Sequence, residues 1–459
     1  MGNVPQLNSD ETLRVPRPVT DEIGQSNGWL RSVVSALPAA ARLVPVAYSF
    51  ADQALAVGAT FLANVMLART QTKEEYGMFA LSYSLFTFLA GLHNSALLEP
   101  CTVYASGRYR NRFSDYLRLM VRINALVGLL LSMVVLLVCL GLYWAAPQYV
   151  SRALLGLGLT VGVLLSGSFL RRVFYLQRQP AFAAQASLIC FVSVACALGL
   201  VAKAHLLSGF SVFMILAMGW IAAGLGLGRK LDLRRPGPSF LELEPNYWRE
   251  HWKYSKWVLA TAFVFQLTTQ GYYWILAGFV SVKDVAGLRA MQMLVAPMDQ
   301  VFIALSFLVI PALAERYASN RMANFLAFSK RYGLVVASAT ALFAFAVRII
   351  GKPVMHLLYN GKFDDLAPLL YVLAFLPLCT GIGNVLGSAL SAAEKPKFVF
   401  YAYVCGGAAT LLGGIPLVIR FGLMGAVYGL LLSAGVYTTA LASGFFLVVY
   451  RKATRLSVP

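Results

Sequence analysis

Charged and polar side chains interrupt the apolar stretch "GLRAMQMLVAPMDQVF" at residues 287–302. On a helix, Arg289, Gln292 and Asp299 fall within an arc of about 80°, so they share one face. A charge at the centre of a spanning helix costs roughly 2.5–3.5 kcal/mol on insertion scales. Lipid cannot satisfy such groups, so this face must point into protein or into a water-filled cavity. Arginine there could bind a phosphate-type anion, and the carboxylate could balance charge, gate, or take up a proton.

Other polar residues also gather on single faces. Gln266, Gln270 and Tyr273 span about 60° on the apolar stretch that comes before. Neutral groups of this kind suit hydrogen bonds to sugar hydroxyls. A second stripe, about 80° wide, contains Thr380, Asn384, Ser388 and Ser391. The first hundred residues carry a thinner set, made up of Asp52, Gln53, Thr60, Asn64, Arg69, His93, Asn94 and Glu99.

Each of these residues also has a purely structural interpretation. Small polar side chains, such as the stripe around Asn384, often hydrogen-bond packed membrane helices together. Arg69 stands at a helix end and could extend to the lipid headgroups. Arg289 and Asp299 lie about 15 Å apart along one helix, so each would need a separate partner. His93 is typical of a hydrogen-bonded packing residue.

Asp52 and Glu99 stand near the expected cytoplasmic ends of their spans. There they could face headgroups or loop arginines. Together with Asp299 they are also the candidates for coupling or gating.

The elements that must position these residues are transmembrane helices. The chain has 459 residues, of which 59% are hydrophobic and 12% charged, whereas soluble chains are about 25% charged. Apolar runs near 20 residues match the hydrocarbon thickness. We expect an all-α polytopic membrane protein of about twelve spans, at 45–69, 76–104, 116–144, 150–174, 181–203, 208–228, 254–279, 286–313, 327–350, 365–391, 398–419 and 422–450.

The basic residues predict the orientation. With both termini in the cytoplasm, about three-quarters of the 38 lysines and arginines fall on the cytoplasmic side, as the positive-inside rule requires. This bias accounts for most of the net charge of +19. Nucleic-acid binding is not expected, because the basic residues are spread over many short loops. The six cysteines lie in or beside spans without metal-site spacing, so no metal, cofactor or disulfide framework is expected.

The chain also repeats itself. "LARTQTKEEYGMFALSYS" (67–84) echoes "AGFVSVKDVAGLRAMQML" (277–294), and two later echoes follow in the same order. Six helices per half give both halves one orientation, a parallel repeat found in secondary transporters. We therefore expect two six-helix lobes around a central cavity. The expected divisions are a tail with an interfacial helix (1–43), an N-terminal lobe (44–228), a cytoplasmic linker (229–253), a C-terminal lobe (254–450) and a second cytoplasmic tail (451–459).

The stretch "FLANVMLARTQTKEEYGMFALSYSLF" resembles the first hairpin of polysaccharide transporters in the multidrug/oligosaccharidyl-lipid/polysaccharide (MOP) flippase superfamily. "LRRVFYLQRQPAFAAQ" and "IPLVIRFGLMGAVYGLLLS" are similar to that family too, so the resemblance covers roughly residues 45–450. It implies movement of a lipid-linked oligosaccharide across the bacterial inner membrane. It also implies a polyprenyl-linked substrate, membrane lipids, and a polymerase and glycosyltransferases as candidate partners.

We therefore expect a flippase in which Arg289 meets the pyrophosphate of a lipid-linked sugar while the lobes rock around the site, with no covalent step. The expected cavity residues are Arg289, Gln292, Asp299, Gln266, Gln270, Tyr273, Asn64, Arg69 and Asn384. One alternative is a cation-coupled multidrug exporter of the same superfamily, which would favour acidic cavity residues. Another is a membrane-embedded polymerase or ligase, but the sequence shows no outward cluster of carboxylates or histidines.

Overall fold

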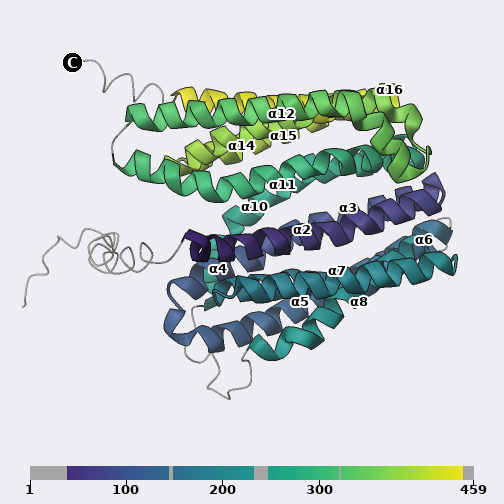
Figure 1. Ribbon diagram of the computed structural model, residues 1–459, viewed down its shortest axis with the longest axis horizontal. Coiled ribbons are helices and arrows are strands. Elements are labelled where there is room, and N and C mark those ends of the chain that lie inside the picture. Colours follow the sequence, from purple (N-terminus) through teal and green to yellow (C-terminus); the bar gives the residue numbers. More distant parts are fainter. Residues whose placement is uncertain (1–38, 144–147, 232–246, 320–321, 448–459) are drawn as a thin grey trace, which may run out of the picture.

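A computed structural model describes residues 39–143, 148–231, 247–319 and 322–447, and its regular elements in those ranges are all helical. The helices form two lobes that lie one above the other in Figure 1. The N-terminal lobe contains α2 (Ala39–Thr70), α3 (Lys73–His93), α4 (Glu99–Ser106), α5 (Phe113–Tyr143), α6 (Gln148–Leu176), α7 (Pro180–Lys203) and α8 (Gly209–Leu227). The C-terminal lobe contains α10 (Tyr247–Phe279), α11 (Val282–Ala318), α12 (Met322–Tyr359), α13 (Ala367–Leu373), α14 (Leu376–Ala392), α15 (Pro396–Ala409) and α16 (Ile415–Phe445).

Every expected span corresponds to helical segments, and the two-lobe architecture is confirmed. Within the described residues, eight helical stretches are long and apolar enough to cross a membrane. The helices missing from that set are α3, with its continuation α4, α10 and α11. α3 packs against both α10 and α11, so the least apolar spans are those that meet at the boundary between the lobes.

Two predicted boundaries have clear local causes. α16 contains a reversal at Gly422, whose φ of 57° suits glycine, and a Cβ at Gly425 would lie 1.9 Å from the carbonyl oxygen of Leu417. The predicted spans 398–419 and 422–450 are thus two passes that meet at this residue. The predicted span 365–391 breaks between α13 and α14, just before Pro377.

Residues 1–38 of the expected tail (1–43), most of the linker (232–246) and the C-terminal tail lie outside the described residues. α2 begins at Ala39, six residues before the span predicted for it and inside the stretch expected to be an interfacial helix. The helix continues through Pro45.

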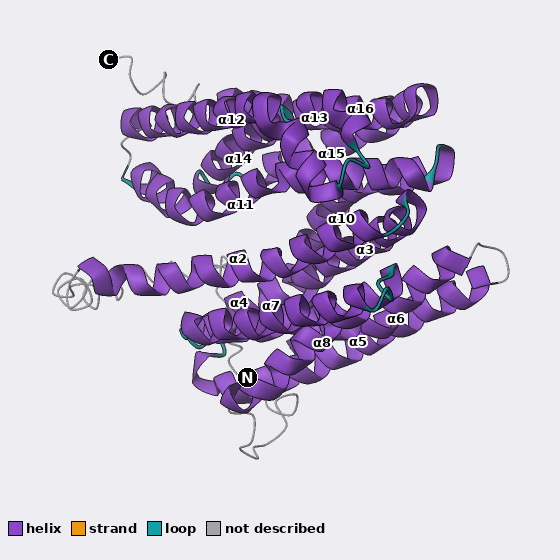
Figure 2. Cartoon of the chain, turned by 45° about the vertical axis from the view of Figure 1, so that its right-hand side comes forward, coloured by secondary structure: helices purple, strands orange, loops and turns teal. Residues whose placement is uncertain are grey.

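The two lobes meet most closely at the end of the molecule where α2 ends and α3 begins, which we call the outer end. It lies at the right of Figure 1, and Figure 2 shows the same lobes after a turn of 45°. Thr72 caps α3 by accepting a hydrogen bond from the Glu75 N–H, and Ser281 caps α11 through the Asp284 N–H. A Cβ placed on Gly77 of α3 would lie 2.0 Å from the carbonyl oxygen of Val282 on α11. Glycine therefore allows direct backbone contact between the lobes.

Gly77→Ala should force α3 and α11 apart and destabilise the protein by about 1–3 kcal/mol, as other overpacked sites do. The thermal midpoint of the purified protein in detergent measures this. Gly199→Ala on α7 is the matched control, because a Cβ there meets no atom within 4 Å and alanine favours the helix. Equal midpoints for the two variants would contradict the close contact.

Candidate functional site

Arg289 lies between the lobes, on the face of α11 that meets α2 and α3. Its side chain is 8% exposed. Its Nε donates a hydrogen bond to Asn64 Oδ1 on α2 at 3.0 Å, and its guanidinium lies 4.7 Å from the centre of the Tyr83 ring on α3. Within the described part of the chain, no carboxylate lies within ion-pairing distance of it. Arg289 is thus a buried cation held by the Asn64 amide, the Tyr83 ring and the Tyr273 hydroxyl, and no described carboxylate balances its charge.

Neutral tyrosine and glutamine side chains surround this arginine. The hydroxyl of Tyr273 on α10 donates to the side-chain carbonyl of Gln292, one turn along α11 from Arg289. Tyr359, at the end of α12, donates to the backbone carbonyl of Ala290 at 3.0 Å. The buried hydroxyl of Tyr76 contacts no hydrogen-bond partner among the residues that the structure describes. The surroundings thus supply hydrogen-bonding groups but no negative charge.

The two glutamines of α10 face the same lobe boundary. Gln266 is buried, and its side chain packs against Gly91 of α3. The buried Oε1 atoms of Gln266 and Gln270 both lack a hydrogen-bond partner within the described ranges. An unpaired buried polar atom costs about 1–3 kcal/mol. Water or a substrate hydroxyl between the lobes would remove that cost.

A second polar contact joins α2 and α11 nearer the other end of the lobes. Gln53 Nε2 donates to Gln300 Oε1 at 2.9 Å. On α2, Gln53 comes 11 residues before Asn64, and on α11, Gln300 comes 11 residues after Arg289. The two helices therefore run antiparallel with a shared register. The two contacts are separated by about 16 Å along the helices. Asp299, the residue before Gln300, is exposed and has no described hydrogen-bond or ion-pair partner.

Asp52 lies in the N-terminal lobe and is fully satisfied. It is 1% exposed and accepts hydrogen bonds from Arg171 Nε at 2.8 Å and Nη2 at 2.7 Å, Tyr175 at 2.7 Å, and Ser187 at 2.5 Å. Arg171 Nη2 also donates to Gln53 Oε1 at 3.0 Å. The cluster therefore positions Gln53, which bonds Gln300 of the other lobe.

The remaining predicted residues occupy three other places. Glu99 accepts a hydrogen bond from Asn94, whose carbonyl oxygen is held by Arg172. Asn384 accepts from Ser306 inside the C-terminal lobe at 3.0 Å. Arg69 is exposed at the outer end, 3.4 Å from the Leu357 carbonyl oxygen. None of these three contacts reaches the surroundings of Arg289.

Of the expected cavity residues, the structure brings together Arg289, Gln292, Tyr273 and Asn64. His93 is buried and bonds Asn124 at 2.9 Å, so it has the packing role expected of it. Sequence reasoning missed Tyr83, which only the fold brings to Arg289. It also missed Arg171 and Arg172. The signal for both was present, because two adjacent arginines stand inside the apolar run 164–176.

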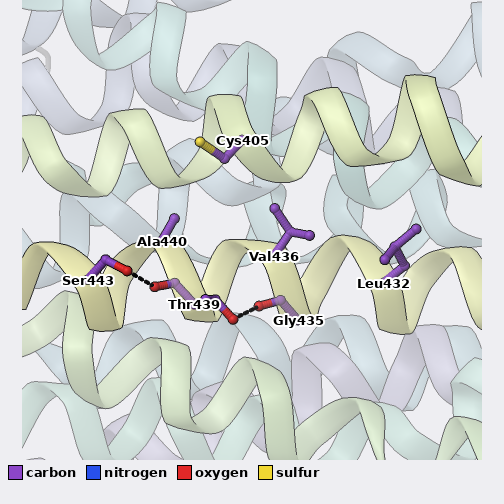
Figure 3. A pocket seen from close by; sticks show the side chains of 7 residues that line it. All are labelled: Cys405, Leu432, Gly435, Val436, Thr439, Ala440 and Ser443. Carbon is purple, nitrogen blue, oxygen red and sulfur yellow. Dashed lines mark hydrogen bonds between the residues drawn. The ribbon is translucent and has the colours of Figure 1, made fainter.

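A separate cavity of about 470 Å³ lies between α15 and α16 (Figure 3). The hydroxyls of Thr439 and Ser443 donate to carbonyls of their own helix, so the wall that they form is largely apolar. The lining residues are Cys405, Leu432, Gly435, Val436, Thr439, Ala440 and Ser443. None belongs to the polar faces that surround Arg289.

No protein-family model and no curated protein sequence matches the chain. Solved structures do share its fold. The inward-facing conformation of a multidrug resistance MATE family transporter of the MOP superfamily has a TM-score of 0.73, with 10% identity, covering 89% of this chain and 96% of that one. The lipid II flippase MurJ in an inward closed conformation has a TM-score of 0.65, with 13% identity, covering 87% of each chain.

The chain therefore has the same fold as these two proteins. An outward-facing MATE family transporter of the MOP superfamily also matches, with a TM-score of 0.62, 10% identity, and coverage of 89% of this chain and 95% of that one. These neighbours are transporters and a flippase, and the apolar helices agree with them in indicating a multi-pass membrane protein.

The four hydrogen bonds that Asp52 accepts predict how its replacement affects stability. Asp52→Asn should leave the part-buried Arg171 beside a neutral group and cost up to about 3–5 kcal/mol, so little protein should accumulate in the membrane. Glu74→Gln is the control, since it removes an exposed ion pair that contributes about 0–1 kcal/mol. Quantitative blotting of membranes measures both. A stable Asp52→Asn protein that has lost only transport would instead support the coupling role.

Proposed function

We propose that the chain is a flippase that moves a lipid-linked oligosaccharide, such as a polysaccharide repeat unit, from the cytoplasmic to the outer leaflet of the bacterial inner membrane. The observation that carries the proposal is Arg289, a cation 8% exposed between the lobes and without a described carboxylate partner. A buried charge needs compensation. The anionic headgroup of a lipid-linked sugar would supply it during transport.

The contacts of Arg289 suit a phosphate ligand. Asn64 occupies Nε and Tyr83 covers one face of the guanidinium. The edge that carries the two Nη atoms is the part through which arginine binds phosphate oxygens in bidentate fashion. Gln266, Gln270 and Gln292 would hydrogen-bond the sugar hydroxyls. The lipid tail would stay in the bilayer through the gap between the lobes, and no bond of the substrate would break.

The conformation suits the first half of such a cycle. The contacts between α3 and α11 lie at the outer end, where Lys283 pairs with Glu74 at 2.9 Å and Gly77 touches Val282. At the other end the start of α10 is joined to the N-terminal lobe, through Tyr104 to the Glu250 carbonyl and Ser255 to the Ala96 carbonyl. Towards the other end, only the neutral Gln53–Gln300 hydrogen bond joins α2 to α11 among the described residues. With both termini in the cytoplasm, this geometry is an inward-facing or inward-closed state. The higher TM-score of the inward-facing MATE structure supports the same assignment.

The cation-coupled multidrug exporter is the alternative within this fold. The exposed Asp299 on α11, next in sequence to Gln300 of the cross-lobe contact, is the observation that favours it, because a drug cation would need a carboxylate. In the flippase, Asp299 would balance charge or carry a coupling proton. A membrane-embedded polymerase would share the lipid-linked substrate but is not supported by any of the transporter neighbours.

Deletion of the gene should abolish an exported polysaccharide, because its repeat unit would accumulate on the cytoplasmic leaflet. Extraction of lipid-linked oligosaccharides and accessibility of their sugars to added glycosidase in oriented vesicles measure the effect. Unchanged glycans together with sensitivity to cationic drugs would select the exporter instead.

Arg289→Ala should lower transport by about ten-fold or more, because a hydrogen bond to a charged group contributes roughly 1.5–3 kcal/mol. Folding should persist, since no described carboxylate loses its partner. Arg289→Lys keeps the charge without the planar fork and should retain partial activity. The matched control is Arg348→Ala, an exposed arginine that lies 4.6 Å from the centre of the Tyr371 ring. Full activity of Arg289→Ala in the glycosidase assay would refute the role of this residue.

A further inference from the structure

Lys362 of the C-terminal lobe caps the C-terminal end of α2, a helix of the N-terminal lobe. Its Nζ lies 2.7 Å from the Gln71 carbonyl oxygen, 2.8 Å from that of Arg69 and 3.3 Å from that of Ala68. The last turn of a helix leaves carbonyls without partners and carries the negative end of the helix dipole. One ammonium group thus uses three hydrogen bonds to fasten the end of a helix in the opposite lobe.

The segment that carries Lys362 is held in a defined shape. Asn360 and Gly361 both have positive φ, at 55° and 78°, which turns the chain sharply after α12. His356 Nδ1 then lies 2.6 Å from Asp364 Oδ2 across this turn. The turn therefore presents Lys362 towards α2 from a fixed base.

Weaker contacts surround this lysine at the same end. Lys283 bonds Glu74 at 2.9 Å and lowers the pKa of that carboxyl through the hydrogen bond, so Glu74 stays ionised at neutral pH. Lys73 lies 3.8 Å from Asp365 and 5.2 Å from the centre of the Phe363 ring. Both ion pairs are at least one-third exposed on each side, which leaves Lys362 as the best-satisfied charged contact between the lobes here.

Aromatic residues of the same turn cover the surroundings of Arg289, and we call Tyr359 and Phe363 the aromatic cover. The Phe363 ring contacts Tyr359 and Tyr76 at centroid distances of 5.4 and 6.2 Å. Tyr359 in turn bonds the carbonyl of Ala290, the residue after Arg289. A headgroup at Arg289 could leave towards the outer end only if this aromatic cover moved away from α2.

We propose that Lys362 is the residue that locks the outer exit, by capping α2 from the other lobe, and that its release opens the Arg289 site outwards. The proposal rests on the proposed function for its direction of transport. The lock itself requires only alternating access, so it would hold for any substrate that a protein of this fold transports.

The test is accessibility from outside, which requires no substrate. In a background with the six cysteines replaced, Thr60→Cys places a thiol one turn from Asn64, on the face of α2 that meets α11. Right-side-out membrane vesicles are treated with a membrane-impermeant maleimide. Lys362→Gln should raise the labelling rate about five-fold or more, while Lys362→Arg should leave it low because the charge remains.

Lys352→Gln is the matched control, because this exposed lysine of α12 has no described contact with the other lobe. Its labelling rate should equal that of the parent. If Lys362→Gln fails to accumulate, Lys283→Gln tests the same closed end and should raise labelling about two-fold. Unchanged labelling in the accumulating variant would overturn the lock. A rise in labelling with no glycan phenotype on gene deletion would keep the lock and reject the flippase.

Discussion

A polar group inside the hydrocarbon region must find its partner within the protein. This constraint arranges the polar side chains of the two lobes. Asp52 meets it completely, with four hydrogen bonds from three side chains. Arg289 meets it only in part, through the Asn64 amide, the Tyr83 ring and the Tyr273 hydroxyl, with no described carboxylate. The first arrangement stabilises a lobe, and the second leaves capacity for a ligand where the lobes meet.

The same constraint separates the helices into two groups. Helices such as α5 present leucine and valine to the outside and are recognised as spans by apolarity alone. α3, α10 and α11 fall short of that apolarity and pack against one another across the lobe boundary. Their polar residues are therefore concentrated where movement between lobes would expose them to water. Arg289, Gln266 and Gln270 all lie on these helices.

The amino-acid pattern was sufficient for the helices and their pairing into halves, because hydrophobic length and repeated segments are local properties. It also placed Arg289 and Gln292 on one face of a helix. It could not identify Asn64 as the partner of Arg289, since 225 positions separate them along the chain. Lys362 was beyond reach for a related reason. It binds backbone carbonyls, and every residue type carries those, so no sequence signal marks the contact.

The magnitudes of the outer contacts are compatible with a reversible cycle. Moving an equilibrium from 1:99 to 99:1 requires about 5.5 kcal/mol of differential binding. Exposed ion pairs such as Glu74–Lys283 contribute about 0–1 kcal/mol each. Hydrogen bonds from a charged group such as the Lys362 ammonium contribute roughly 1.5–3 kcal/mol. Their sum is of the same order as the energy that a phosphate headgroup gains from a buried arginine. Buried apolar residues of both lobes, such as Tyr76, Val285 and Phe363, also share one core at this end. The polar contacts are therefore the part of the closing energy that a charged ligand can offset.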